Sequence, residues 1–173
     1  MAEVDQIVAW QLGRPPSIDF KVARECIFGW PAVLMSSVVT MAGSPNPNRY
    51  YLSCPFLRRR LAVLEDEGHI RRFEERIQAE DGLRASVMAA QEAHRREWGR
   101  QAAAFNLKAR SALIAGAARP TALKCLHAHM AWYLVHPDYQ LGQQVAALAG
   151  EQWCADELCR EALANEDECE AAG

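Results

Sequence analysis

The chain has 173 residues, half of them hydrophobic, and a formal net charge of −3 at pH 7. This length can bury a core of ordinary size, so we expect one globular domain over residues 1–164 and an acidic flexible tail over residues 165–173. Six cysteines without a secretory signal indicate reduced thiols in the cytoplasm. No apolar run reaches the ~20 residues that a membrane-spanning helix needs, so no membrane association is expected.

The N-terminal third is predicted to hold a short helix and a small strand pair. Apolar residues from Val4 to Leu12 repeat at helical spacing, and Gly13 followed by prolines ends the pattern. Two runs rich in β-branched and aromatic residues follow, ARECIFGWPAVLMSSVV at 23–39 and RYYLSC at 49–54. The breaker sequence SPNPN separates them, so they are predicted to pair as two strands.

From Pro55 onwards the spacing of apolar residues becomes helical. Leucines at i, i+4 and i+7 predict a helix that ends near Glu67, and a second helix is expected to begin near His69. A stripe of apolar residues from Leu83 to Phe105 then predicts one long helix.

Two further helices are expected near the C-terminus. Thr121 can cap a helix that runs to about Val135, and a last helix is expected over residues 139–164. The predicted fold class is therefore α+β and predominantly α-helical, with the strand pair packed on a bundle of about five helices.

Arginines dominate the basic residues and gather at positions 58–60, 71–72 and 95–96. Such clusters make RNA or another anion a conceivable partner. Glutamates alternate with these arginines at helical spacing, which favours solvated helix faces carrying intrahelical ion pairs. The same faces, with the acidic C-terminus, are also compatible with a protein partner.

The stretch ALKCLHAHMAWYL at 122–134 places a cysteine before two alternate histidines. On a regular helix Cys125 and His129 share one face and His127 points away, but His127 can converge if Cys125 stands in an irregular first turn. Thiolate and imidazole together suit zinc or iron. Since two ligands do not hold a structural metal, Cys26 and Cys54 are the best further candidates, because each lies at the edge of a strand-like run beside Gly or Pro.

These residues define a Cys3His-type metal site that would join the strand pair to the helix at 121–135. The alternative interpretation is that the cysteines and histidines are unreactive core residues. Cys154 and Cys159 are five apart and do not share a helix face, so they are expected to be surface or partner-helix thiols. His94 lies on an apolar stripe with Trp98 and is expected to be a hydrogen-bonded core residue.

Several blocks resemble those of a bacterial family catalogued as domain of unknown function 501. The family pattern includes a C-x-x-G-x-P block, a Leu-Thr-Cys-Pro block and a Lys-Cys-Leu-His block. The corresponding segments here are CIFGWP at 26–31, YYLSCP at 50–55 and KCLH at 124–127, beside a further similar block, LEDEG at 64–68. The resemblance spans residues 20–145 approximately, and Ser53 stands where the family usually has threonine. It implies no assigned activity, but it favours His127 over His129 as a ligand.

Three functions are compatible with these observations. The first is a small metal-binding protein of structural or regulatory role, with zinc held by three cysteines and a histidine. The second is an enzyme in which three thiolates hold zinc or an iron–sulfur cluster with an open coordination position, assisted by Lys124 or a histidine. The third is a metal-free helical adaptor that binds other proteins. Metal content discriminates among the three.

Overall fold

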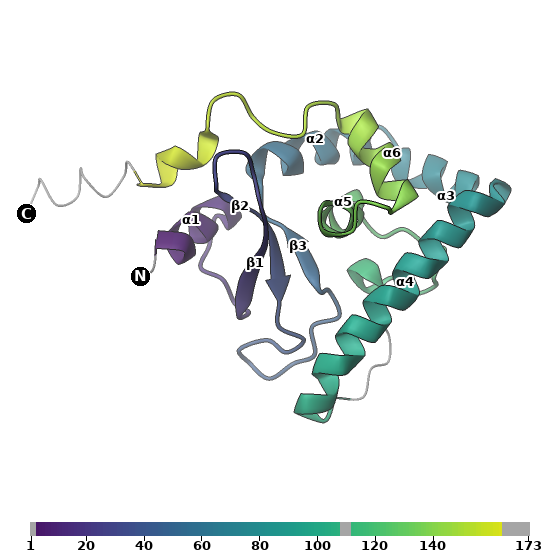
Figure 1. Ribbon diagram of the computed structural model, residues 1–173, viewed down its shortest axis with the longest axis horizontal. Coiled ribbons are helices and arrows are strands. Elements are labelled where there is room, and N and C mark those ends of the chain that lie inside the picture. The colour runs from purple at the N-terminus through teal and green to yellow at the C-terminus, as the bar shows by residue number, and fades with distance from the viewer. Residues whose placement is uncertain (1–2, 108–111, 164–173) are drawn as a thin grey trace, which may run out of the picture.

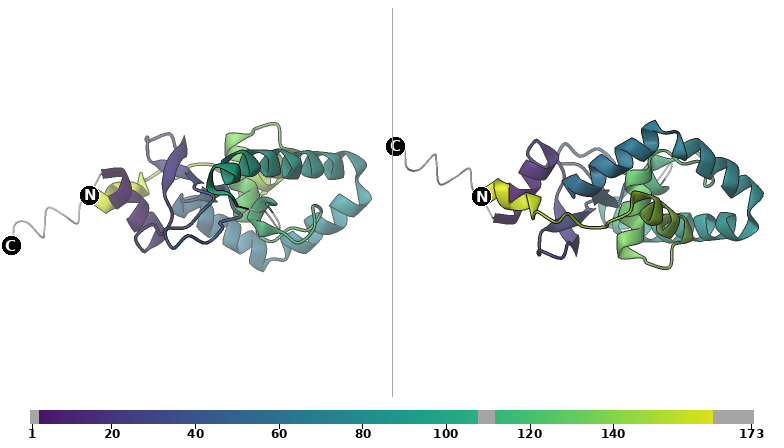
Figure 2. Two further views of the ribbon diagram at one scale, coloured as in Figure 1. Left: turned by 90° about the horizontal axis from the view of Figure 1, so that it is seen from below. Right: turned by 90° about the horizontal axis from the view of Figure 1, so that it is seen from above.

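The computed structural model describes residues 3–107 and 112–163, and it confirms an α+β fold dominated by helices. Figure 1 shows a small sheet beside a group of helices, with the long helix α4 along the opposite side. Seen from the two directions of Figure 2, the molecule is elongated. The sheet, α1 and the C-terminal segment lie towards one end, and α3 and α4 form the other.

The sheet has three antiparallel strands in the order β1-β2-β3, one more than the predicted pair. Its strands are β1 (Phe20–Glu25), β2 (Pro31–Ser36) and β3 (Tyr50–Leu52). The first predicted run contains a hairpin, because Gly29 adopts a φ of +82° and allows the chain to turn between Cys26 and Trp30. Helix α1 (Glu3–Leu12) packs near β2, so the predicted N-terminal helix is confirmed.

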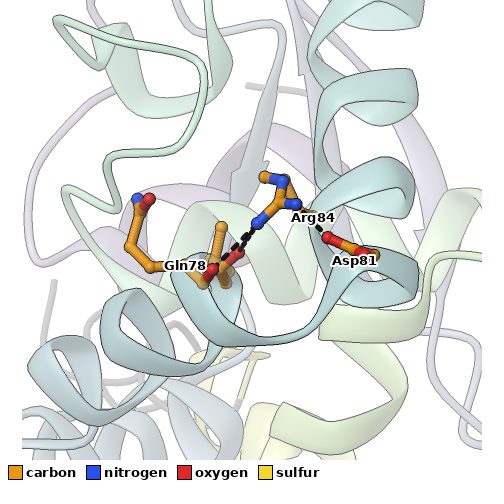
Figure 3. A network of polar contacts seen from close by, with 4 residues as sticks. Gln78, Asp81 and Arg84 are labelled. Atoms are coloured by element: carbon orange, nitrogen blue, oxygen red, sulfur yellow. Dashed lines mark hydrogen bonds and ion pairs between the residues drawn. The ribbon is translucent and has the colours of Figure 1, made fainter.

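The three helices that follow begin and end close to their predicted positions. They are α2 (Pro55–Asp66), α3 (His69–Ala79) and α4 (Asp81–Ala102), followed by a 3-10 turn at Ala103–Phe105. The leucines at positions 57, 61 and 64 are buried, as their spacing predicts. At the corner between α3 and α4, the Arg84 guanidinium donates to the Gln78 carbonyl oxygen at 2.8 Å and pairs with Asp81 (Figure 3). This contact links the end of α3 to the first turn of α4.

Helix α5 (Leu126–Val135) is the centre of the core and contacts β3, α2 and α6 (Gln140–Ala149). In Figure 1 it is seen end-on between the sheet and the other helices. The prediction that Thr121 caps this helix is wrong. Cys125 is extended, with φ −158° and ψ 147°, and it is the N-cap, so helical geometry starts only at Leu126.

The last predicted helix is shorter than expected. Helix α6 ends at Ala149 because Gly150 turns the chain with a φ of +78°. Residues 150–157 are irregular, and a 3-10 turn follows at Leu158–Arg160; another such turn lies at Ile114–Gly116. The predicted tail at 165–173 lies outside the described residues.

The C-terminal segment packs on the N-terminal helix. Ile7 of α1, Cys159 and Ala162 form a buried cluster, against which Trp10 and Trp30 pack. Polar contacts accompany it: the Gln6 side chain donates to the Ala162 carbonyl at 3.2 Å, and the Gln11 side chain donates to the Pro31 carbonyl at 2.7 Å. The two ends of the described chain therefore meet at one end of the molecule.

Most of the clustered arginines make contacts within the chain. Arg58 and Arg60 donate to the backbone carbonyls of Gln11 and Ala149. Ion pairs on the helix surfaces link Arg71 to Glu75, Arg76 to Glu80 and Arg95 to Glu92. Of the clustered arginines, Arg71 and Arg95 thus form the predicted intrahelical ion pairs, whereas Arg58 and Arg60 bind backbone carbonyls instead.

Candidate metal centre at the start of helix α5

Three potential metal ligands meet where α5 begins. Cys125 is the N-cap, His127 stands in the first turn, and Glu65 reaches them from the last turns of α2. The sulfur of Cys125, a ring nitrogen of His127 and a carboxylate oxygen of Glu65 all lie within 4.8 Å of one another. All three residues are half-buried. The extended backbone of Cys125 is the irregular first turn that lets His127 converge on the thiol.

The hydrogen bonds around His127 define how the ring is held. Its Nδ1 lies 2.9 Å from a Glu65 carboxylate oxygen, and its Nε2 lies 3.0 Å from the Arg58 carbonyl oxygen. The same Glu65 oxygen accepts the backbone N–H of Leu126, one of the free amides at the start of α5. Glu65 therefore ties α2 to the first turn of α5, and both ring nitrogens of His127 face oxygen acceptors.

The Cys125 thiol is protonated near neutral pH. Burial raises its pKa, and the Glu65 carboxylate adds to this shift. The backbone N–H groups of Ala128 and His127 and the ammonium of Lys124 act in the opposite direction. A cation bound beside the sulfur would reverse the balance, because a coordinating thiol loses its proton.

His129 lies away from this group. Its side chain is fully buried in the core, and its Nδ1 is 2.7 Å from the hydroxyl of Tyr139. Burial lowers the pKa of His129 to about 3, so the ring is neutral. Of the two candidate histidines, the structure thus brings His127, and not His129, next to Cys125.

Cys26 and Cys54 do not join Cys125 either. They line a separate small cavity together with Cys154 and Cys159, beside the N-terminus of α2. The four residues of the expected Cys3His set are therefore divided between two places in the fold.

Sequence reasoning missed Glu65, Cys154 and Cys159. Glu65 lies inside the LEDEG block, so the family resemblance was a signal for it, although spacing alone could not show that it faces residue 127. The sequence predicts Cys154 and Cys159 on one helix, where they would diverge. Cys154 lies instead in an irregular stretch and Cys159 in the 3-10 turn, and both residues line the same cavity.

A cleft of about 650 Å³ lies beside the candidate metal centre. His127 is at its edge, and Arg58 and Arg59 from α2 supply positive charge. The other lining residues are Trp10, Pro55, Ala62, Leu158 and Glu161. One of the three candidate ligands, His127, therefore borders a space that a small anionic molecule can enter.

The fold and site define a small helix-dominated α+β protein with a candidate three-ligand metal centre. The chain matches the model of the family described as "Protein of unknown function (DUF501)" over residues 22–147, and it belongs to this family. No curated protein and no solved structure matches it. In the described part of the chain, no helix has both the length and the apolar character needed to cross a membrane.

Proposed function

We propose that this protein binds a divalent transition metal, with zinc as the best fit, through Glu65, Cys125 and His127. The observation that carries the proposal is the meeting of a sulfur, a nitrogen and an oxygen donor within 4.8 Å of one another. This donor set belongs to the usual ligands of zinc. Cys26 and Cys54, which the sequence predicts as ligands of the same ion, are not part of this centre because they line another cavity.

The hydrogen bonds of His127 fit a ligand role. A metal-bound histidine normally donates its second N–H to a carbonyl or carboxylate, which fixes the ring orientation. Here Nε2 faces the Arg58 carbonyl oxygen, which leaves Nδ1 directed at the side where Glu65 lies. A metal at this position would replace the contact between Nδ1 and the Glu65 oxygen, and both atoms would become its ligands.

The bound metal would link α2 to α5. Glu65 comes from α2, whereas Cys125 and His127 belong to the start of α5. Since binding energy at such a site is also folding energy, occupancy would stabilise the packing of these two helices. This is a structural or regulatory role. As in the site predicted from the sequence, the metal joins two separate parts of the fold, here α2 and α5.

Catalysis is the second candidate function, and the adjacent cleft favours it. Three protein ligands leave one tetrahedral position of zinc for water or substrate, as in hydrolytic zinc enzymes. Arg58 and Arg59 line the cleft beside His127 and would attract an anionic substrate. Lys124 precedes Cys125 in the chain and is available as a proton donor.

Zinc titration against a chromophoric chelator tests the metal centre. Glu65→Gln retains an acceptor for the Leu126 N–H but loses the charged ligand, and His127→Ala removes the nitrogen donor. Both should weaken zinc binding by more than the ~10–100-fold that loss of an outer contact causes. His69→Ala, at the start of α3 and outside the group of candidate ligands, is the matched control. Unchanged zinc affinity in both site variants would refute the proposal.

Cobalt substitution separates a structural role from catalysis. The visible spectrum of bound Co²⁺ reports its coordination, and an open position changes the spectrum when inorganic phosphate is added. A phosphate-dependent change that is lost in Arg58→Ala would support catalysis at the cleft. A spectrum that phosphate leaves unchanged would support a closed, structural centre.

A further inference from the structure

Four of the five described free cysteines line one cavity beside the N-terminus of α2. Cys26 follows β1, Cys54 precedes α2, and Cys154 and Cys159 belong to the C-terminal segment. The cavity is nearly enclosed, and its free centre of about 10 Å³ has room for about one water molecule or ion. Its remaining walls are mostly apolar, formed by Trp30, Pro31, Pro55, Phe56, Trp153 and Leu158.

Cys54 and Cys159 each lie within electrostatic range of other cysteines of the cavity. The pKa of Cys159 is raised to about 11, mainly by burial, and Cys26, Cys54 and Cys154 add to the shift. Burial also raises the pKa of Cys54, and Cys26 and Cys154 contribute. Cys125 is absent from both sets of neighbours, which agrees with its separate location.

The two most buried thiols, Cys54 and Cys159, lie next to N–H donors that favour the thiolate form. The Gln11 side chain donates a hydrogen bond of 3.2 Å to the Cys159 sulfur. The first-turn N–H groups of Phe56 and Leu57 lower the pKa of Cys54, which is the N-cap of α2. Amide donors directed at cysteine sulfurs stabilise thiolates, and they tune metal–thiolate centres in the same way.

We propose that Cys26, Cys54, Cys154 and Cys159 together bind a second, thiophilic metal centre, either zinc or an iron–sulfur cluster. Four thiolates are a complete ligand set for either. The site is independent of the centre at Glu65, Cys125 and His127. It requires the C-terminal segment, which lies beyond the family match at residues 22–147.

Two observations bear on the form of the centre. The free space at the middle of the cavity suits a single ion. The sulfurs are spread more widely, because no three of these four described cysteines have ligand atoms mutually within 4.8 Å. A zinc ion with Zn–S bonds of about 2.3 Å holds its sulfurs less than about 4 Å apart, whereas a four-iron cluster holds them wider. Either form requires the cysteine side chains to move from their positions in this structure.

Metal analysis of the full-length protein, purified without oxygen, tests the proposal. Cys154→Ser and Cys159→Ser should each lose the second metal and retain zinc at α5, whereas Cys125→Ser should do the reverse. This reciprocal pattern separates the two centres, so that one can fail while the other stands. Iron with equal acid-labile sulfide and a brown colour identifies a cluster, and one colourless zinc identifies a single ion.

A second measurement covers variants that fail to fold. In the unmodified protein, the four cysteines should resist alkylation by iodoacetamide together and become reactive together when a chelator removes the metal. Mass spectrometry of the labelled peptides reads each cysteine separately. After loading with zinc, or with iron and sulfide, the metal content of the parent protein is compared with that of Cys154→Ser and Cys159→Ser. The proposal is overturned if the parent protein holds no more metal than these variants.

Discussion

Cys54 and Cys125 occupy the same local position, the N-cap of a helix, and neither makes a side-chain capping hydrogen bond. Serine is a much better N-cap than a residue without an oxygen acceptor. A serine at either position therefore keeps or improves the helix while it removes a metal ligand. The effect of residues 54 and 125 on the helix can therefore be measured separately from their proposed role as metal ligands.

We predict that Cys125→Ser, measured with a chelator present, is at least as stable as the parent protein and exceeds Cys125→Ala by about 0.5–2 kcal/mol. Urea denaturation of the three metal-free proteins gives the comparison. With zinc present the order should reverse, because only the parent protein gains binding energy. If Cys125→Ser remains at least as stable as the parent protein in saturating zinc, Cys125 is not a ligand.

His94 should make the metal-free protein sensitive to mild acid. It is buried, its Nε2 accepts the Arg49 N–H, its Nδ1 contacts the Ala112 carbonyl, and burial lowers its pKa. Because the unfolded chain binds the proton more readily, stability is complete above the ordinary histidine pKa of ~6.5 and falls as the pH decreases below it. We expect the urea midpoint to decrease between pH 7.5 and pH 5. A constant midpoint would contradict this.

The α5–α6 crossing depends on a residue without a side chain. A Cβ atom on Gly142 would lie 2.2 Å from the Tyr133 Cβ, so the helices cannot keep their separation with a larger residue there. Gly142→Ala should cost about 1–3 kcal/mol or more, read from the thermal midpoint. Gly99→Ala is the matched control in α4, because no atom lies within 4 Å of its added Cβ. It should stabilise the helix by about 0.5–1 kcal/mol.

At the level of elements, the spacing of apolar residues predicted the presence of the helices well. It predicted the ends of helices poorly where contacts with distant residues determine them. Spacing predicted the break near Gly68 and the buried stripe from Leu83 to Ala102 correctly, but Phe105, its predicted last member, is exposed in a 3-10 turn. The start of α5 was misplaced because its first amide is capped by Glu65, which lies 61 residues earlier in the chain. Spacing within one segment contains no information on such a partner.

The candidate site shows the same division between local and distant information. The family block KCLH indicated Cys125 and His127, and the structure brings these two together. The grouping of Cys26 and Cys54 with them could not be judged from sequence, since it depends on how the hairpin and α2 pack. Cys154 and Cys159 were missed because the break at Gly150 turns a predicted helix into an irregular segment.

For the whole molecule, the C-terminal segment up to residue 163 should be essential and the residues after it dispensable. Ending the chain at Ala149 exposes Ile7, Trp10 and Trp30, whose apolar surfaces the segment covers. We expect the thermal midpoint to fall by at least about 10 °C, since each such side chain contributes roughly 1.5–3 kcal/mol when buried. Removing residues 165–173 should leave the midpoint unchanged. A large fall in that second variant would show that the acidic tail is part of the folded structure.

The pairing of the C-terminal segment with α1 and the hairpin also sets an order of events during translation. Cys26 and Cys54 emerge from the ribosome early, but their cavity has no closed wall until residues 153–159 have been synthesised. The side chains of Ile7 and Trp30 are likewise covered only after the same segment has been synthesised. Because domains form from the N-terminus onwards as the chain grows, the nascent protein passes through a stage with two uncovered thiols and an uncovered apolar face. When the four-cysteine cavity is complete, these thiols and this apolar face become covered. The growing chain is then no longer open to oxidation and aggregation at these groups.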